Sequence, residues 1–281
     1  MSLLFREESK HPDISKIPRF AVASVYIMVK RRPFLGIGRF KRALLSGFTE
    51  KVKSVSATLD YSKFMQHHLV KGGTFAGLLY IATRKHVNVS LLSRIRGLTP
   101  PAPYHISLFP YYDAVIEFQF SGQLSDEQRA TINDLARYLA GKCKRVSVME
   151  SNRRYKAFDD KSPAKKNPFH MVFISQEPPH IVREQAQKHW INDHAAFVVN
   201  HVKYTRMKRY RISHSTLDKN SPYENRYGGI AFVEFNSLPA FMRNMLNPNA
   251  VRLNNSIVLD EMNLSADSKI MLMKEYDLGD G

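Results

Sequence analysis

Short apolar runs and segments of helical periodicity alternate along this chain. Runs such as 21–29 and 113–120 have the length and the β-branched and aromatic content of strands, whereas 125–139 repeats its apolar residues every three or four positions. Strands are predicted at 21–29, 61–69, 113–120, 145–150, 169–174, 204–214, 228–235 and 270–276. Helices are predicted at 34–48, 125–139, 181–201 and 238–245. Each half of the chain therefore follows the order strand, helix, strand, strand, helix, strand.

The two halves are also similar in detail. Segment 61–69 begins with an aromatic residue and ends in histidines, as 204–214 does, and 113–120 aligns with 228–235. We therefore predict an α+β fold built from two similar units. The predicted division is a unit at 1–157 with an insertion at 71–110, a linker at 158–167 rich in Lys, Pro and Ser, and a unit at 168–281.

The predicted helix at 181–201 is the most site-like segment. Its apolar positions recur at helical steps: Val182, Ala186, Trp190, Phe197 and Val198. His194 comes one turn after Trp190, so its imidazole shares the apolar face and points at the element on which the helix packs. Because imidazole changes protonation near neutral pH, His194 is a candidate general acid or base. The alternative is a structural histidine that is hydrogen-bonded to a backbone carbonyl.

The predicted strand at 204–214 supplies further candidates, because alternate residues share one face of a strand. The residues on one such face are Tyr204, Arg206, Lys208, Tyr210, Ile212 and His214. Arginine and tyrosine groups there would bind a carboxylate or a phenol, whereas an edge strand with its charges in water is the alternative. The predicted substrate-binding residues are Trp190, Tyr204, Arg206, Tyr210, His214 and Glu234. Glu234 and Asp260 are acids that would orient a histidine or else form surface salt bridges.

These residues together resemble the EthD family. The similarity rests on Trp190 and His194 with Ala195 and Val198, on the tyrosine-rich strand that ends in His214, on the Tyr-Gly-Gly-Ile-Ala run at 227–231, and on Asp260 followed by Glu261. It spans about 168–277. The family belongs to the dimeric α+β barrel proteins, whose units have a ferredoxin-like βαββαβ order. The resemblance thus implies two ferredoxin-like units that form an intrachain barrel, a pseudo-dimer, and hence a monomeric protein.

Composition indicates a globular protein that can bury a substantial core. The 281-residue chain is 43% hydrophobic and 11% aromatic. Its single cysteine, Cys143, excludes an intramolecular disulfide or a cysteine-based zinc site and favours a reducing compartment. The apolar run near the start is too short for a signal peptide, and no stretch reaches the ~18–20 apolar residues of a membrane helix. We expect a cytoplasmic protein.

The formal net charge of +17 is held almost entirely by the first half. Residues 1–157 contain 26 Lys and Arg against 11 Asp and Glu, and residues 158–281 contain 16 against 14. Such a positive field concentrates anions, from carboxylate substrates to lipid or nucleic acid. The basic, amphipathic segment 34–55 has the pattern of a helix that lies on an anionic membrane. The alternative, which is the more common case, is a helix that packs on a core with a solvated basic face.

Motifs for metals and cofactors are weak. His67 and His68 are adjacent in a predicted strand and so point in opposite directions, and no further ligand spacing accompanies them. The pair Gly36 and Gly38 lacks the third glycine of a dinucleotide-binding loop. The sequence therefore predicts neither a metal nor a cofactor.

Two functional hypotheses remain. Members of the EthD family are small enzymes or accessory proteins of aromatic, polyketide and ether metabolism, so the resemblance implies a small aromatic or polyketide-like acid as the ligand. An enzyme of this type would be a cofactor-independent lyase, cyclase or decarboxylase that uses His194. The rival is a non-catalytic binding module whose basic first half docks on an anionic surface, either membrane or nucleic acid.

Overall fold

The structure is a computed structural model that describes residues 19–20, 23–70, 111–163, 165–217, 223, 226–261, 265 and 269–279. The predicted insertion at 71–110 lies outside the described residues. The strands are β1 (Arg19–Phe20), β2 (Ser24–Lys30), β3 (Lys63–Leu69), β4 (Ala114–Gln119), β5 (Arg145–Asp159), β6 (Phe169–Ser175), β7 (Met207–Ser215), β8 (Gly229–Phe235) and β9 (Lys269–Asp277). The helices are α1 (Ile37–Ala43), α2 (Thr49–Lys53), α3 (Ser56–Leu59), α6 (Asp126–Ala140), α7 (Arg183–His189), α8 (Ala196–Asn200), α9 (Leu238–Leu246) and α10 (Pro248–Glu261).

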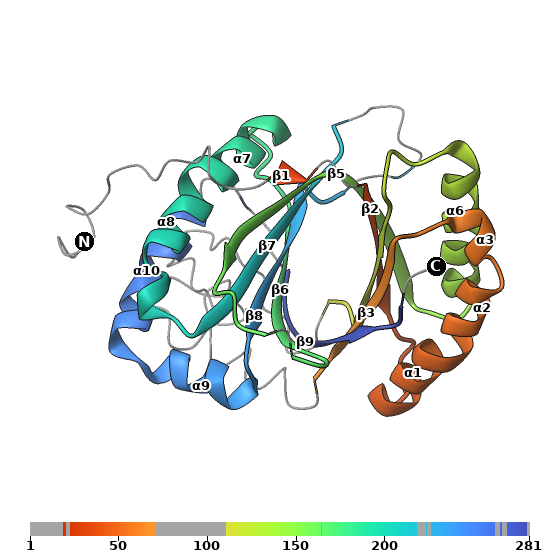
Figure 1. Ribbon diagram of the computed structural model, residues 1–281, viewed down its shortest axis with the longest axis horizontal. Coiled ribbons are helices and arrows are strands. Elements are labelled where there is room, and N and C mark those ends of the chain that lie inside the picture. The colour runs from red at the N-terminus through yellow and green to blue at the C-terminus, as the bar shows by residue number, and fades with distance from the viewer. Residues whose placement is uncertain are drawn as a thin grey trace, which may run out of the picture.

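The strands form one antiparallel sheet that closes on itself as a barrel (Figure 1). Within the described residues its order is β1-β5-β2-β4-β3-β9-β6-β8-β7, and β5 also pairs with β7. The last pairing closes an eight-stranded barrel, and the short β1 extends one edge of β5. The spatial order in the first half, β5-β2-β4-β3, is repeated in the second half as β9-β6-β8-β7. The halves meet edge to edge through β3 with β9 and β5 with β7.

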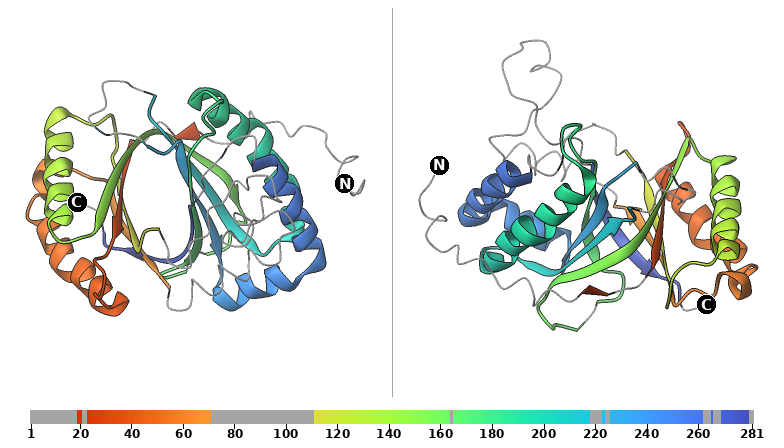
Figure 2. Two further views of the ribbon diagram at one scale, coloured as in Figure 1. Left: turned by 180° about the vertical axis from the view of Figure 1, so that it is seen from behind. Right: turned by 90° about the horizontal axis from the view of Figure 1, so that it is seen from above.

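Helices cover the outside of the barrel on two opposite sides (Figure 2). Those of the first half, with the π-helical turn Leu44–Phe48 that joins α1 to α2, pack on their own strands. The residues that they bury there include Phe40, Leu44, Phe48 and Val52. The predicted helix at 125–139 is confirmed as α6, and Ser125 and Gln128 form the capping box at its start. The core accordingly has three parts: one under each set of helices and one inside the barrel.

The predicted order of strands and helices in each half is confirmed. The short elements β1 and α3 were not predicted, and three further differences concern longer elements. Strand β5 does not end at Glu150 but continues to Asp159, because its second part leaves β2 and pairs with β7. The predicted strand at 204–214 begins only at Met207. Helix α10 was not predicted at all. In the part of the chain that the structure describes, no helix combines the length and the apolar content needed to cross a membrane.

Candidate functional site

His194 lies in a π-helical turn, Trp190–Ala195, that joins α7 to α8. This turn packs on the outer face of β7 and β8, so Trp190 and His194 are both buried, with 5% and 4% exposure. The indole Nε1 of Trp190 donates a hydrogen bond of 3.1 Å to the hydroxyl of Tyr210. The predicted meeting of this helix face with the tyrosine strand is therefore present in the structure.

Helix α10 brings a carboxylate to His194. The Nδ1 atom of His194 is 2.8 Å from Oδ2 of Asp260, and the other carboxylate oxygen is 2.9 Å from Nε2 of His189. His189 in turn lies 3.1 Å from Asp193 at its Nδ1. His189 and Asp193 are partly exposed. The four side chains thus form a continuous polar chain from the surface to the buried imidazole.

These contacts determine the charge of the cluster. Burial disfavours ionisation of Asp260, but the hydrogen bonds from His189 and His194 outweigh it and hold the pKa of this carboxyl below its ordinary value. The same contact with Asp260 raises the pKa of His189 against the opposing effect of burial. Burial raises the pKa of the Tyr210 hydroxyl above its ordinary value, so this group stays protonated.

His194 borders a cavity of about 60 Å³ between the helices and the sheet. Most of the lining is apolar, including Trp190, Tyr210 and Ile257, and the polar part comes from side chains such as Asn244, Asn254 and Glu261. The described lining contains neither Lys nor Arg. Nε2 of His194 is 3.7 Å from Oε1 of Glu261, which is beyond hydrogen-bond distance.

The structure separates the six predicted substrate-binding residues. Trp190 and Tyr210 line this cavity. His214 contacts the Trp190 ring at a centroid distance of 5.5 Å without being part of the lining, and burial followed by the charge of Arg153 lowers its pKa to about 3.

Tyr204 and Arg206 precede the strand instead of lying on its face. Tyr204 ends a short 3-10 turn and stacks on His201, and Arg206 is exposed. Glu234 lies on the other face of the sheet, inside the barrel, where its Oε1 accepts a bond of 2.7 Å from Arg209. A β-bulge between Met207 and Arg209 shifts the alternation of the strand, which the sequence pattern did not reveal.

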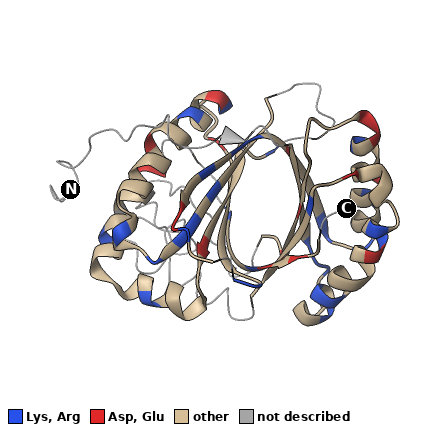
Figure 3. Ribbon diagram, viewed as in Figure 1, with Lys and Arg blue, Asp and Glu red and all other residues tan. Residues whose placement is uncertain are grey.

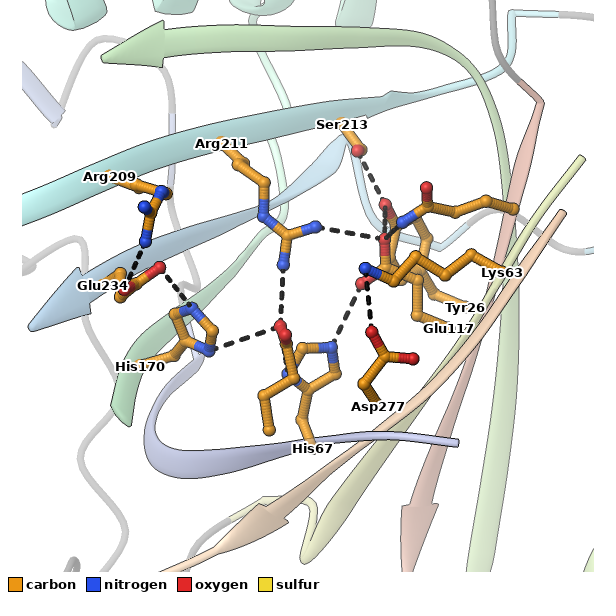
Figure 4. Close-up of polar contacts among 12 residues, drawn as sticks. Tyr26, Lys63, His67, Glu117, His170, Arg209, Arg211, Ser213, Glu234 and Asp277 are labelled. Carbon is orange, nitrogen blue, oxygen red and sulfur yellow. Dashed lines mark hydrogen bonds and ion pairs between the residues drawn. The ribbon is translucent and has the colours of Figure 1, made fainter. Parts of the chain in front are cut away.

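A second polar network lies inside the barrel (Figure 4). Arg211 is at its centre, 3.4 Å from Oε1 of Glu117 and 3.1 Å from Oε2 of Glu275. His67 Nε2 is 3.1 Å from Oε2 of Glu117, and His170 lies between Glu275 and Glu234. Each residue comes from a different strand, so the closed barrel alone brings them together.

Ion pairing outweighs burial in this network. Burial alone would raise the pKa of Glu117, yet Arg211, His67 and Arg154 hold it below its ordinary value. The carboxyl of Glu275 also has a lowered pKa, because Arg211, His67 and His170 together outweigh the effect of burial, which alone would raise it. Both carboxylates are therefore ionised at neutral pH and Arg211 is charged.

A larger cavity, of about 720 Å³, opens onto this network. Its cationic lining residues are Lys63, Arg154, Lys156, Lys165, Lys166, Arg209 and Arg211. Its acidic lining residues are Glu234, Glu275 and Asp277. Part of the positive charge of the chain thus faces the barrel, while Figure 3 shows other Lys and Arg on the helices outside it.

Four members of this network were not predicted as site residues from the sequence: Glu117, His170, Arg211 and Glu275. The available signal was a charged or imidazole side chain in the middle of an otherwise apolar strand, as at Glu117 in β4. That signal identifies a buried polar residue, but it does not identify the strands that face it.

No protein-family model matches the sequence, and no curated protein matches it either. Among solved structures, an anthrone oxidase-like protein is similar over 94% of this chain and 98% of its own, at a TM-score of 0.51 and 8% identity. A dye-decolorizing protein from V. cholerae has a TM-score of 0.47 and 11% identity over 95% of this chain and 97% of its own. A mutant chlorite dismutase from Candidatus Nitrospira defluvii has a TM-score of 0.46 and 11% identity over 91% of each chain.

At these identities the similarity concerns the fold alone. The closed antiparallel barrel with helices on its outside is the architecture of the dimeric α+β barrel proteins. The predicted α+β fold class is thereby confirmed.

Proposed function

We propose that this chain is an EthD-like barrel protein that binds a small aromatic or polyketide-like acid and moves one of its protons through His194, as a cofactor-independent lyase, cyclase or decarboxylase. The observation that carries the proposal is the 2.8 Å contact between Nδ1 of His194 and Asp260 at the wall of a largely apolar cavity. A carboxylate at Nδ1 fixes the tautomer and stabilises the imidazolium that forms when Nε2 accepts a proton. His194 is then the catalytic base, and Asp260 is its positioning residue.

The lining defines the type of acid. An apolar wall with Trp190 and Tyr210 suits an aromatic ring, whereas a carboxylate ion would find no Lys or Arg among the described lining residues. The proton that His194 takes is therefore one held on carbon or on a phenol. Among the three reaction types, this lining favours a lyase or a cyclase over a decarboxylase, whose substrate is a carboxylate. A volume of 60 Å³ admits water but not a ring. The substrate accordingly enters when α10 moves away from the sheet, a closure step of the kind common in enzymes.

The polar chain behind His194 supplies a route for the proton. Asp260 bridges His194 and His189, and His189 reaches Asp193 at the surface. A proton accepted at His194 can return to solvent after the substrate has closed the cavity, because His189 remains partly exposed.

The repeated strand order supports a finer proposal for the architecture. Each half has the order of a ferredoxin-like βαββαβ unit, so the chain is a tandem pseudo-dimer with units at 1–157 and 168–281. Because both outer pairings, β3 with β9 and β5 with β7, are made within the chain, the protein is a monomer in solution. A light-scattering mass of twice 32.3 kDa would contradict the proposed monomer.

Trp190 is the one tryptophan of the chain, so its fluorescence reports on this cavity specifically. We expect anthrone, a neutral carbon acid, to shorten the Trp190 fluorescence lifetime saturably. Salicylate, a carboxylate, should not do so even where calorimetry shows that it binds. Saturable binding of anthrone without any change in the Trp190 lifetime would place the ligand elsewhere, such as the larger barrel cavity, and would overturn the proposed site.

One observation favours the rival function, docking on an anionic membrane. Phe34 is fully exposed and has a φ of 66°, a left-handed conformation that bulky residues rarely adopt. Exposed cations flank it in the sequence: Arg32 precedes it, Arg39 and Arg42 follow in α1, and Lys51 and Lys53 follow in α2. An exposed aromatic ring in a segment with many exposed cations is suited to the interface of an anionic bilayer. The apolar face of 37–53 is buried in the core, so only this tip and the cations are available for contact.

Sedimentation with phosphatidylserine vesicles tests this second candidate. Phe34→Ser and the combined change of Arg39, Lys51 and Lys53 to Gln should each reduce vesicle binding at least several-fold. Lys188→Gln is the matched control, because this exposed lysine lies on α7 in the other half. Vesicle binding that survives both changes would exclude the tip as a membrane contact.

A further inference from the structure

Three potential ligand side chains lie close together inside the barrel, and two of them, His67 and His170, are labelled in Figure 4. His67 lies on β3, His170 on β6 and Glu275 on β9, which are neighbours in the sheet. The Nδ1 atoms of His67 and His170 are 3.8 Å and 3.7 Å from the same carboxylate oxygen, Oε2 of Glu275. The three potential ligand atoms lie within 4.8 Å of one another. Both imidazoles are buried, with side-chain exposures of 0% and 2%.

The opposite nitrogen of each imidazole faces a different carboxylate. Nε2 of His67 is 3.1 Å from Oε2 of Glu117, and Nε2 of His170 is 3.7 Å from Oε2 of Glu234. A hydrogen on Nε2 of His67 then bonds Glu117, and one on Nε2 of His170 faces Glu234 across a distance longer than a hydrogen bond. Both Nδ1 lone pairs are then directed at Glu275. Histidines that bind metals usually donate their other N–H group to a carboxylate in this way.

The Nδ1 atoms of His67 and His170 have no hydrogen-bond partner among the described residues. Two buried imidazole lone pairs that face a carboxylate oxygen with no donor of their own are unfavourable, because a buried polar atom normally has a partner. A cation at the centre would satisfy all three. We infer that His67, His170 and Glu275 bind a divalent transition-metal ion such as Zn²⁺ or Fe²⁺.

The spacing and the donor set suit such an ion. Bonds of about 2.0–2.2 Å to nitrogen and oxygen place the ligand atoms of a tetrahedral site roughly 3.3 Å apart. The distances of 3.7 and 3.8 Å reach that value after small side-chain rotations. Two histidines and one carboxylate bind iron or zinc and leave further coordination positions open. His170 and Glu275 border the 720 Å³ cavity, so the open positions face it.

The charges around the site are balanced before the ion binds. The three carboxylates Glu117, Glu234 and Glu275 are paired with three guanidinium groups, those of Arg154, Arg209 and Arg211. Arg211 occupies one lone pair of Oε2 of Glu275 and leaves the second lone pair to the ion. A divalent ion therefore adds net positive charge. An anion from the cavity, such as hydroxide or a carboxylate, would complete its coordination.

Titration of the tag-free, metal-stripped protein with Co²⁺ and with Zn²⁺ tests the inference. The wild type should bind one equivalent, give the visible absorption of low-symmetry Co²⁺ and melt at a higher temperature with Zn²⁺. Replacing a ligand, as in His170→Gln or Glu275→Gln, should abolish the spectrum. Glu117→Gln should weaken binding by the ~10–100-fold typical of losing a carboxylate behind a ligand. His180→Gln, at an exposed histidine, is the control and should change nothing.

The wild-type titration decides the question even if a ligand variant fails to fold. Absence of a one-to-one Co²⁺ complex in the folded wild type would overturn the inference, as would full binding by both ligand variants. His194→Gln should retain the metal, because His194 lies on the opposite face of the sheet. The metal site and the proposed acid–base site thus succeed or fail separately.

Discussion

Tyr26 and Ser213 share a hydrogen bond of 2.7 Å inside the barrel, although they belong to opposite halves of the chain. Tyr26 lies on β2 of the first half and Ser213 on β7 of the second. A similar bond of 2.8 Å joins the hydroxyls of Tyr112 and Tyr227. The halves are therefore connected through the barrel interior as well as along their edges, and they should unfold together.

Tyr26→Phe should destabilise the whole chain. The change leaves the Ser213 hydroxyl without its partner in a buried place, at an expected cost of about 1–2 kcal/mol in the free energy of unfolding. Urea denaturation followed by circular dichroism measures this cost, and the transition should stay single. Tyr138→Phe is the control, because among the described residues its hydroxyl forms a hydrogen bond with the exposed Lys142 alone. A wild-type transition in two steps would contradict the coupling of the halves.

Gly229→Ala should disturb the site beside Trp190. A Cβ atom at Gly229 would lie 2.8 Å from the carbonyl oxygen of Ser213 and 3.0 Å from the Trp190 ring. Because the backbone of the neighbouring strand cannot move away without breaking its pairing, we expect a loss of about 1–3 kcal/mol in the free energy of unfolding and an altered Trp190 emission. Gly47→Ala is the matched control: nothing lies within 4 Å of the added atom, and alanine should stabilise this helical position by up to ~1 kcal/mol. Equal effects of the two changes would refute this packing.

The stability of the protein should fall between pH 7 and pH 5, partly through His214. Burial, followed by the charge of Arg153, lowers the pKa of His214 to about 3, whereas an unfolded histidine titrates near ~6.5. Below that pH the unfolded chain binds a proton that the folded chain does not, so stability present above the unfolded pKa is lost as the pH falls. At pH 5 the loss is about 2 kcal/mol from this one group.

His214→Phe removes this dependence while keeping a ring against Trp190 and Tyr155. Nε2 of His214 has no hydrogen-bond partner among the described residues, so phenylalanine removes no hydrogen bond at this atom. Relative to the wild type, the variant should gain about 2 kcal/mol when the pH is lowered from 7 to 5. Denaturation curves at the two pH values give the difference. A difference that does not change with pH would show that His214 is not buried in its neutral form.

The order of the elements could be predicted because it depends on local patterns. Alternating apolar runs and the capping box at Ser125 reflect interactions within a few residues, and both halves follow the predicted order. Helix α10 was missed because its apolar face is weak and polar asparagines such as Asn254 are buried in it. The contact of Asp260 with His194 depends on this helix. From the sequence it was only one of two alternatives, the other being a surface salt bridge.

The inside of the barrel could not be predicted for a different reason. The faces of β3 and β9 that meet there are set by the closure of the sheet, and closure depends on pairings between distant strands. His67 was correctly predicted to point away from His68, but its neighbours His170 and Glu275 lie far away in the sequence. A one-residue bulge in β7 also changes which of its residues face the helices. Tyr204 and Arg206 precede this strand, which begins at Met207.

The exchange of carbon-bound hydrogen of anthrone for deuterium in D₂O, followed by NMR, tests the central claim most directly. It needs only a base at the substrate and no knowledge of the complete reaction. We expect the wild type to accelerate the exchange and His194→Gln to lower the rate by ~10²–10⁴-fold, while His180→Gln has no effect. Asp260→Asn should lower the rate too, and it should change the pH dependence of exchange because it alters the tautomer of His194. Undiminished exchange by folded His194→Gln would contradict the account.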